Sequence, residues 1–178
     1  MSAVTAKFVV ADAGPLIALA VGGVLTEAID MLGGILVPDA VMEECTADVS
    51  APGSKLISEA ALRPGFELIP SSVLASFDAA FAQGLGTGEI AVLAYAGQHK
   101  LLALVDERRA RRVAQRLGIL VIGSGTVLAQ LKLQGQIVSV KPVLELWRRH
   151  GYFVAPAIER DIVARAGELL GKSQLTRR

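Results

Sequence analysis

Residues 8–17 read FVVADAGPLI, and this stretch decides how the rest of the chain is interpreted. Its apolar run is typical of a short buried strand that ends on Asp12, and the Gly-Pro pair that follows marks a break before a helical segment. Asp12 is the only charged residue between Lys7 and Glu27. A carboxylate at the end of a buried strand costs free energy unless a partner stabilises it. The central question about this chain is therefore which group lies beside Asp12.

The composition indicates a folded protein of one domain. The chain has 178 residues, of which 52% are hydrophobic and 20% are charged, and this excludes a disordered chain. We expect a single domain over residues 1–172 and a flexible tail at 173–178. The high apolar content predicts a core rich in Ala, Val and Leu and a homo-oligomer interface. No apolar run approaches the ~20 residues that a membrane helix needs, so no membrane association is expected.

The N-terminus lacks a basic segment followed by a long apolar one, so it does not resemble a secretory signal. Cys45 is the single cysteine and cannot form an internal disulfide. Both features predict a protein of the reducing cytoplasm. Cys45 itself is interpreted as a small buried hydrophobic residue.

Charge is unevenly distributed along the chain. Residues 1–99 contain 3 Lys or Arg and 11 Asp or Glu, whereas residues 100–178 contain 15 and 6, so the two parts carry net charges of −8 and +9. An acidic part beside a basic part fits a metal-binding site flanked by a phosphate-binding surface. Solvated helix faces would give the same asymmetry, and asymmetry alone favours that plainer interpretation.

Short apolar runs alternate with helical segments. Strands are predicted over residues 7–11, 35–37, 66–69, 101–105 and 119–122. Helices are predicted over residues 14–20, 24–32, 40–48 (with Asp39 as its cap), 54–62, 72–82, from 84–89 to 98, 106–117, 126–134, 140–150 and 156–170. This alternation predicts an α/β fold with a parallel sheet covered on both faces.

Acidic residues follow two of the predicted strands directly. Asp12 ends the first strand and Asp106 ends the strand over 101–105. Because ligands bind beyond the carboxyl ends of parallel strands, both acids are expected at one edge of the sheet. Two further acids, Glu44 and Glu89, fall on the apolar faces of their predicted helices and are therefore expected to point inward.

A group of acids near Asp12 would need a shared proton or a cation. Two carboxylates ~4 Å apart repel by about 4 kcal/mol at an effective dielectric constant near 20. Oxygen-only ligands suit Mg²⁺ or Mn²⁺, and a hydrated ion of this kind held by carboxylates is an arrangement that cleaves phosphodiesters. The alternative is that these acids are helix caps and lone surface groups, and spacing alone leaves both possibilities open.

Several motifs occur in order across nearly the whole chain. They are Val10-Ala11-Asp12-Ala13-Gly14-Pro15-Leu16-Ile17, Val37-Pro38-x-x-Val41-x-x-Glu44, Gly86-x-Gly88-Glu89-x-Ala91, Val105-Asp106-Glu107-x-x-Ala110-Arg111, Gly123-Ser124-Gly125-Thr126-x-Leu128 and Ala166-Gly167-Glu168. Their order and spacing resemble the PIN-domain superfamily, specifically its small prokaryotic PIN-like branch related to VapC-type toxins.

The resemblance implies a fold, an activity and a set of site residues. The fold would be a three-layer α/β/α sandwich with a central parallel sheet. The activity would be that of a Mg²⁺- or Mn²⁺-dependent ribonuclease, acting on RNA and neutralised by a cognate antitoxin protein. By position, Asp12, Glu44, Glu89 and Asp106 would be the catalytic acids, with the first, second and fourth as metal ligands. Family members often carry a second Asp where this chain has Glu107, which puts a second metal in question.

The basic part of the chain contains candidate phosphate-binding groups. Gly123–Thr126 lies after a predicted strand and before a helix, so its N–H groups with Ser124 and Thr126 could hold a phosphate; plain helix capping is the competing interpretation. Arg111 and the other arginines of the helix over 106–117 could follow a phosphate backbone or form a solvated or partner-facing surface. The glycines of 84–89 lack the Lys and Ser/Thr of a phosphate-binding loop.

The sequence is compatible with three candidate functions. The first is a metal-dependent endoribonuclease, the toxin of a toxin–antitoxin pair. The second is a non-catalytic PIN-like module that binds nucleic acid or protein. The third, a phosphotransfer or receiver-type module built on Asp12, is disfavoured because no suitably placed Lys is found between residues 56 and 99. Trp147 is expected to anchor the core or an interface, and His99 and His150 are expected to be exposed helix-end residues outside the site.

Overall fold

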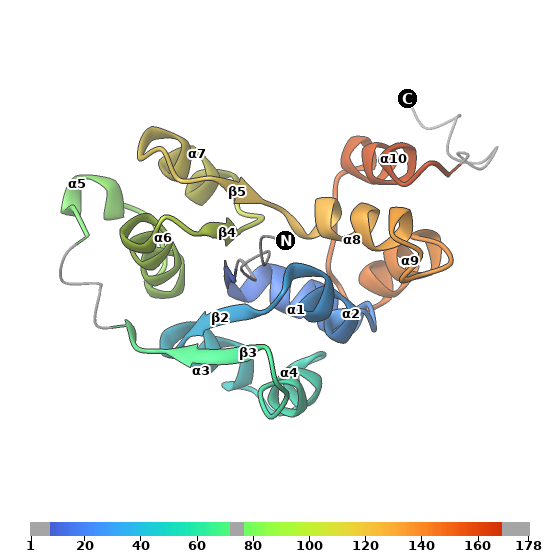
Figure 1. Cartoon of the computed structure of the whole chain (residues 1–178), viewed down its shortest axis with the longest axis horizontal. Coiled ribbons are helices and arrows are strands. Elements are labelled where there is room, and N and C mark those ends of the chain that lie inside the picture. The colour runs from blue at the N-terminus through green and yellow to red at the C-terminus, as the bar shows by residue number, and fades with distance from the viewer. Residues whose placement is uncertain (1–7, 72–76, 169–178) are drawn as a thin grey trace, which may run out of the picture.

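The structure is a computed structural model that describes residues 8–71 and 77–168. Its centre is a five-stranded, all-parallel sheet with the strand order β3-β2-β1-β4-β5 (Figure 1). The strands are β1 (Val9–Ala11), β2 (Ile35–Pro38), β3 (Phe66–Ile69), β4 (Leu102–Leu104) and β5 (Val121–Ile122). All five strands lie within the segments predicted from the sequence, apart from one additional residue, Pro38, at the end of β2.

Ten helices surround the sheet within the described residues. They are α1 (Ala13–Val21), α2 (Leu25–Leu32), α3 (Asp39–Thr46), α4 (Ser54–Ala60), α5 (Ala79–Ala82), α6 (Thr87–His99), α7 (Arg108–Arg116), α8 (Ser124–Leu133), α9 (Lys141–Arg149) and α10 (Pro156–Arg165). Figure 1 shows α3 and α4 beside β2 and β3, α6 and α7 beside β4 and β5, and α8, α9 and α10 gathered together. The predicted α/β/α sandwich is confirmed.

Strand β1 lies in the middle of the sheet and is buried along its whole length. Its last residue, Ala11, is in register with Leu104 at the end of β4. The N–H of Asp12 continues this ladder and donates to the carbonyl oxygen of Leu104 at 3.0 Å. Parallel strands that end in register bring the residues following them to one edge, so Asp12 and Asp106 lie at the same edge of the sheet.

Helix α9 is anchored against the N-terminal helix α1 through Trp147. This side chain is completely buried, and its Nε1 donates to the carbonyl oxygen of Ala18 at 2.6 Å. A Cβ built on Gly22 would lie 2.7 Å from Val143 Cγ1 and 2.9 Å from Trp147 Nε1, so the close packing requires glycine there. The interpretation of Trp147 as a core anchor is confirmed, and the anchor fixes the C-terminal helices relative to α1.

Other predictions for single residues are also settled. Cys45 is buried, and burial, with the charges of Glu44 and Asp12, raises the pKa of its thiol to about 12. It is therefore the protonated, apolar core residue that was predicted. His99 ends α6, His150 follows α9, and both are exposed, as expected.

Some predicted helix limits are wrong. The helix predicted over 126–134 begins at Ser124. The helix predicted over 156–170 ends at Arg165, because Gly167 adopts a left-handed conformation with φ of 70° that terminates it. Asp39 is the first residue of α3 and not its cap; its carboxylate accepts the Ala40 N–H at 2.8 Å.

Two predictions involve residues outside the described ranges. Of the helix predicted over 72–82, residues 72–76 lie outside them and the described part is α5. The predicted tail 173–178 lies outside them entirely. Within residues 8–71 and 77–168, every helix is too short or too polar to cross a membrane.

Candidate active site

Asp12 is the buried acid at the centre of the site. It lies between the end of β1 and the start of α1, and only 6% of its surface is exposed. Burial raises the pKa of its carboxyl group to about 7, while the N–H of Ala13 acts in the opposite direction. Nearby negative charges raise this pKa further; in decreasing order they belong to Glu89, Glu44 and Asp106. The structure therefore brings the three other predicted acids within electrostatic reach of Asp12.

Helices α3 and α6 place Glu44 and Asp12 on either side of Gly88. A Cβ built on Gly88 would lie 3.3 Å from Glu44 Oε2 and 3.8 Å from Asp12 Oδ1. The glycine at the start of α6 thus lets the helix backbone approach both carboxylates closely. Glu44 is itself exposed while its helix neighbours Val41 and Cys45 are buried, so this acid lies at the border of the apolar face.

Asp106 differs from Asp12 because two donors hold its carboxylate. Oδ1 accepts the N–H of Ser124 at 2.9 Å, and Oδ2 accepts the hydroxyl of Tyr152 at 2.5 Å. Sequence analysis missed Tyr152, which lies 46 residues from its partner and belongs to no recognisable motif. The only available signal was general: a buried tyrosine hydroxyl usually finds a polar partner.

Glu89 and Glu107 both take part in helix capping. Glu89 Oε2 accepts the N–H of Gly86 at 2.7 Å, three residues earlier, at the start of α6. Glu107 is exposed, and its Oε1 accepts the N–H of Arg109 at 3.2 Å at the start of α7. Glu89 nevertheless contributes the largest of the charge effects on Asp12. Glu107 is engaged as the cap of α7.

The predicted phosphate-binding residues are only partly brought together. A Cβ built on Gly123 would lie 2.7 Å from Asp106 Oδ1 and 3.2 Å from Arg111 Nη1, so the guanidinium of Arg111 lies near this acid. That Nη1 donates to the carbonyl oxygen of Val105 at 2.8 Å. Ser124 is buried and its N–H is bound to Asp106. The N–H of Thr126 bonds to the Gly123 carbonyl at 3.0 Å, so both amides already have protein partners.

The donor set suits a hard divalent cation. Within the described residues, no salt bridge joins a basic side chain to Asp12, Glu44, Glu89 or Asp106, although the Arg111 guanidinium lies near Asp106. In the same part of the chain, no group of at least three His, Cys, Asp or Glu side chains is spaced to hold one metal ion directly. Mg²⁺ usually keeps several waters in proteins and needs only one or two carboxylates. Buried Asp12, the nearby Glu44 and the oxygen-only donors therefore fit a hydrated ion.

A cluster of acids at the carboxyl edge of an all-parallel α/β/α sheet is consistent with a nuclease-like class of fold. The family model described as the PIN domain matches residues 8–168 of this chain. The chain therefore belongs to the PIN domain family, as the resemblance of its motifs predicted. PIN domains are generally nucleases and typically use divalent metal ions. No curated protein sequence matches the chain.

Proposed function

We propose that this protein is a Mg²⁺- or Mn²⁺-dependent endoribonuclease and the toxin of a toxin–antitoxin pair. The observation that carries the proposal is the state of Asp12: a buried carboxyl group whose pKa is raised to about 7 and whose charged neighbours are acids. Without a cation, an ionised Asp12 is destabilised by burial and by repulsion. A divalent ion would remove both penalties, and PIN domains provide such a site for RNA cleavage.

Asp12, Glu44 and Asp106 would hold the ion, in part through coordinated waters, because no three such side chains of the described residues are spaced to bind one ion directly. When bound, it would lower the pKa of a coordinated water and stabilise charge on the leaving oxygen. The protein's part is to hold these carboxylate oxygens in place. The Ser124 N–H and the Tyr152 hydroxyl fix Asp106, while the buried surroundings fix Asp12.

Glu89 is the acid best placed to accept a proton. Its Oε2 is held by the N–H of Gly86, which leaves Oε1 free of that bond and fixes the direction in which the carboxylate points. The carboxylate also lies within electrostatic reach of Asp12. A positioned carboxylate of this kind can take the proton of an attacking water as a general base.

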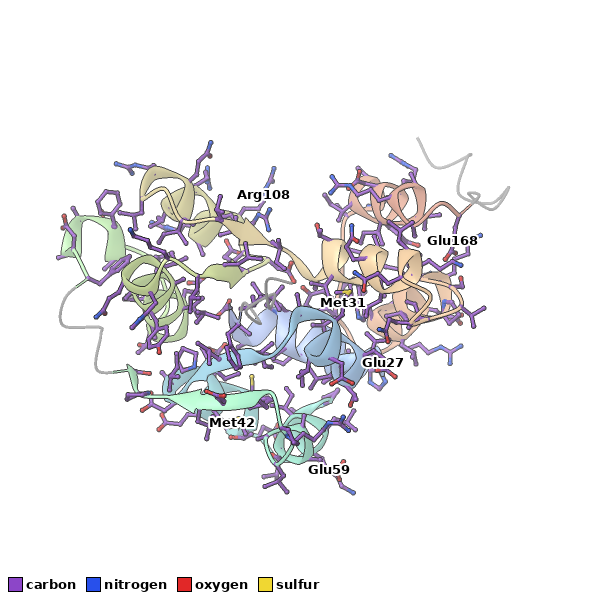
Figure 2. The ribbon with its side chains drawn as sticks, in the orientation of Figure 1. Glu27, Met31, Met42, Glu59, Arg108 and Glu168 are labelled. Carbon is purple, nitrogen blue, oxygen red and sulfur yellow. The ribbon has the colours of Figure 1, made fainter. Side chains whose placement is uncertain are left out.

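The RNA backbone would be held by the arginines of α7, the helix that begins shortly after Asp106. Arg111 lies nearest, while the other four arginines of this helix are exposed: Arg108, Arg109, Arg112 and Arg116. Arg108 is labelled in Figure 2 at the start of α7. Within the described residues, no salt bridge neutralises any arginine of α7. Their positive charge is therefore available for phosphates. The N–H groups of Ser124 and Thr126 already have protein partners, so a further contact at the start of α8 would come from the Thr126 hydroxyl.

The proposal includes partners and a location. The resemblance to VapC-type toxins supports a cognate antitoxin protein and a homo-oligomer, and the single buried Cys45 supports a location in the reducing cytoplasm. Co-expression with the protein encoded next to it should relieve growth inhibition by this chain and should yield a complex on size-exclusion chromatography. Growth inhibition that persists with the neighbouring protein bound would contradict the toxin role.

The direct test is cleavage of a defined single-stranded RNA by the purified protein. Mg²⁺ or Mn²⁺ should support cleavage, EDTA should stop it, and re-addition of Mn²⁺ should restore it. Asp12→Asn should lose the activity while keeping the far-ultraviolet circular dichroism of the parent. Cleavage by Asp12→Asn at the parent's rate would exclude the proposed site.

A non-catalytic PIN module that binds nucleic acid or protein is the second candidate function. One observation favours it: both oxygens of Asp106 are already bound by protein donors, and Glu89 is committed to a helix cap. This function predicts RNA or protein binding that EDTA does not change, with no cleavage under any metal. The same RNA assay therefore distinguishes the two candidates.

A further inference from the structure

Tyr152 reaches the acidic edge from a part of the chain that is distant in sequence. It lies between α9 and α10, and its hydroxyl donates to Asp106 Oδ2 at 2.5 Å. The same hydroxyl interacts with the Ser124 side chain and lies within electrostatic reach of Asp12. Tyr152 is therefore a neighbour of both strand-end acids, although none of the predicted motifs includes it.

The ring of Tyr152 is itself fixed by the core. It packs edge-on against Trp147, with ring centroids 5.2 Å apart and an interplanar angle of 67°. The N–H of Tyr152 donates to the Trp147 carbonyl at 2.8 Å, and Trp147 is bound in turn to Ala18 of α1. Because α1 begins immediately after Asp12, one rigid unit connects the helix that follows the first acid with the hydroxyl that holds the second.

The consequence for Asp106 is a carboxylate held from two sides. Ser124 binds one oxygen and Tyr152 binds the other, so rotation of the carboxylate would break at least one hydrogen bond. A carboxylate has about four lone-pair sites, and two hydrogen bonds leave the others to an incoming ligand. An acid that is already oriented loses less conformational freedom when it binds a cation than a mobile one does.

The chemistry of the donor also matters. A lysine or arginine in place of Tyr152 would pair with Asp106 and neutralise it, which would compete with a cation. A neutral hydroxyl orients the carboxylate and leaves its charge in place. Arg111, the nearby cation, directs its Nη1 to the carbonyl oxygen of Val105.

We infer that Tyr152 is a positioning residue that orients Asp106 for a divalent cation. The inference rests on the proposed function, since it concerns the metal that the acids would hold. It extends the site beyond the strand-end and helix acids to the segment between α9 and α10. Partners that orient a metal ligand typically change metal affinity or activity by about 10- to 100-fold when they are removed.

The test compares Tyr152→Phe with Tyr95→Phe. These are the only two tyrosines of the chain, and Tyr95 packs against His99 in the last turns of α6, with ring centroids 4.1 Å apart. Mn²⁺ affinity is measured from the electron paramagnetic resonance signal of free Mn²⁺, a readout that does not depend on cleavage. Tyr152→Phe should raise the Kd for Mn²⁺ by about 10- to 100-fold, and Tyr95→Phe should leave it unchanged.

A double-mutant cycle shows whether Tyr152 acts through Asp106. In an Asp106→Asn background, adding Tyr152→Phe should change the Kd for Mn²⁺ by less than about twofold, because the oriented carboxylate is already absent. Thermal unfolding of all variants is followed by the emission of Trp147, the single tryptophan. A purely structural role would lower the melting temperature and leave the Kd for Mn²⁺ where it was.

Three results would overturn the inference. The first is a Kd of Tyr152→Phe equal to or lower than that of the parent. The second is an effect of Tyr152→Phe that persists undiminished in Asp106→Asn. The third is a parent protein that binds no Mn²⁺, and this outcome refutes the proposed function together with the role of Tyr152. Failure of the proposed function is seen in the parent protein, whereas failure of the inference about Tyr152 alone is seen only in the variants, so the two can be distinguished.

Discussion

The two strand-end acids occupy equivalent positions and have opposite environments. Ala11 and Leu104, which end β1 and β4, are in register, and an Asp follows each strand shortly afterwards. Asp12 is buried, and its pKa is raised by desolvation and by other acids. Asp106 is half-buried, and two donors from α8 and from the segment before α10 hold it. If the proposed function is correct, the sheet provides one acid that a cation would stabilise and another that is already oriented to help bind it.

The strongest way to break this comparison is to neutralise the buried acid. Asp12→Asn keeps the shape of the side chain and removes its charge. The rate of RNA cleavage should therefore fall more than about 100-fold, the largest loss typical of removing a residue that only orients a metal ligand. Asp30→Asn, at an exposed position of α2, is the matched control and should cleave RNA at the parent's rate. Initial rates at saturating Mn²⁺ measure both. A similar loss in both variants would show that the effect is not specific to the site.

The pH dependence of stability tests the same acid without any substrate. The carboxyl group of Asp12 has its pKa raised from 3.8 to about 7 by folding, so between these values the folded protein keeps a proton that the unfolded chain has lost. The contribution of Asp12 to the free energy of unfolding of the metal-free protein is therefore fully present below the unfolded pKa, and it should fall by up to about 4 kcal/mol as the pH rises from about 4 to 7. Urea unfolding at fixed pH values measures it.

Asp12→Asn supplies the control for that pH series. Asparagine does not titrate, so the variant should lose most of this fall and should be more stable than the metal-free parent at pH 8. Mg²⁺ should stabilise the parent at pH 8 and leave Asp12→Asn nearly unchanged. A parent whose unfolding free energy rises between pH 4 and 7 would contradict the environment assigned to Asp12.

A smaller effect is expected from adding a methyl group where α6 approaches Asp12 and Glu44. Gly88→Ala places a methyl group 3.1 Å from Val41 Cγ2 and 3.3 Å from Glu44 Oε2, so the Glu44 carboxylate must shift. The Kd for Mn²⁺ should rise about tenfold, equivalent to ~1.4 kcal/mol. Gly14→Ala is the control, since a Cβ on Gly14 has nothing within 4 Å. Isothermal titration calorimetry with Mn²⁺ compares them, and equal affinities would show that the close approach at Gly88 plays no part in binding.

The smallest effect should come from the arginines beyond Asp106. Arg108→Gln removes one exposed, unpaired charge from α7, so RNA binding should weaken modestly, and the slope of log affinity against log salt should decrease by about 0.7 for one lost phosphate contact on a single strand. Arg165→Gln, which loses a charge paired with Asp161 at 2.9 Å, should leave that slope unchanged. Fluorescence anisotropy with labelled RNA at several salt concentrations measures it. Equal slopes in the two variants would remove α7 from the RNA-binding surface.

Local patterns predicted most of the fold correctly. The five strands and the order of helices follow from short apolar runs and from 3.6-residue periodicity, which depend on neighbouring residues only. The errors lie at helix ends. There the limit depends on a single residue, such as the left-handed Gly167 after α10 or Asp39, whose carboxylate binds the N–H of Ala40 at the start of α3. The acids at the edge were predictable because parallel strands direct their carboxyl ends to one side of the sheet.

The roles of the individual acids were less predictable than their positions. Glu89 was expected to point inward, and it does lie near Asp12, yet one of its oxygens caps α6. Ser124 was expected to offer its N–H to a phosphate, and that N–H is bound to Asp106. Each of these hydrogen-bonding groups has more than one possible partner, and the sequence does not show which partner lies within 3 Å.

The sequence by itself determined that this chain forms a parallel α/β sheet with acids at one edge, and that it carries the ordered motifs of a PIN domain. Only the tertiary structure decided that Asp12 is desolvated, that α6 approaches Asp12 and Glu44 closely at Gly88, and that Tyr152 holds Asp106. The physical reason is the distance along the chain over which each effect acts. Periodicity and turn chemistry act between residues a few positions apart, whereas desolvation and hydrogen bonding depend on which distant segments the packed core brings together.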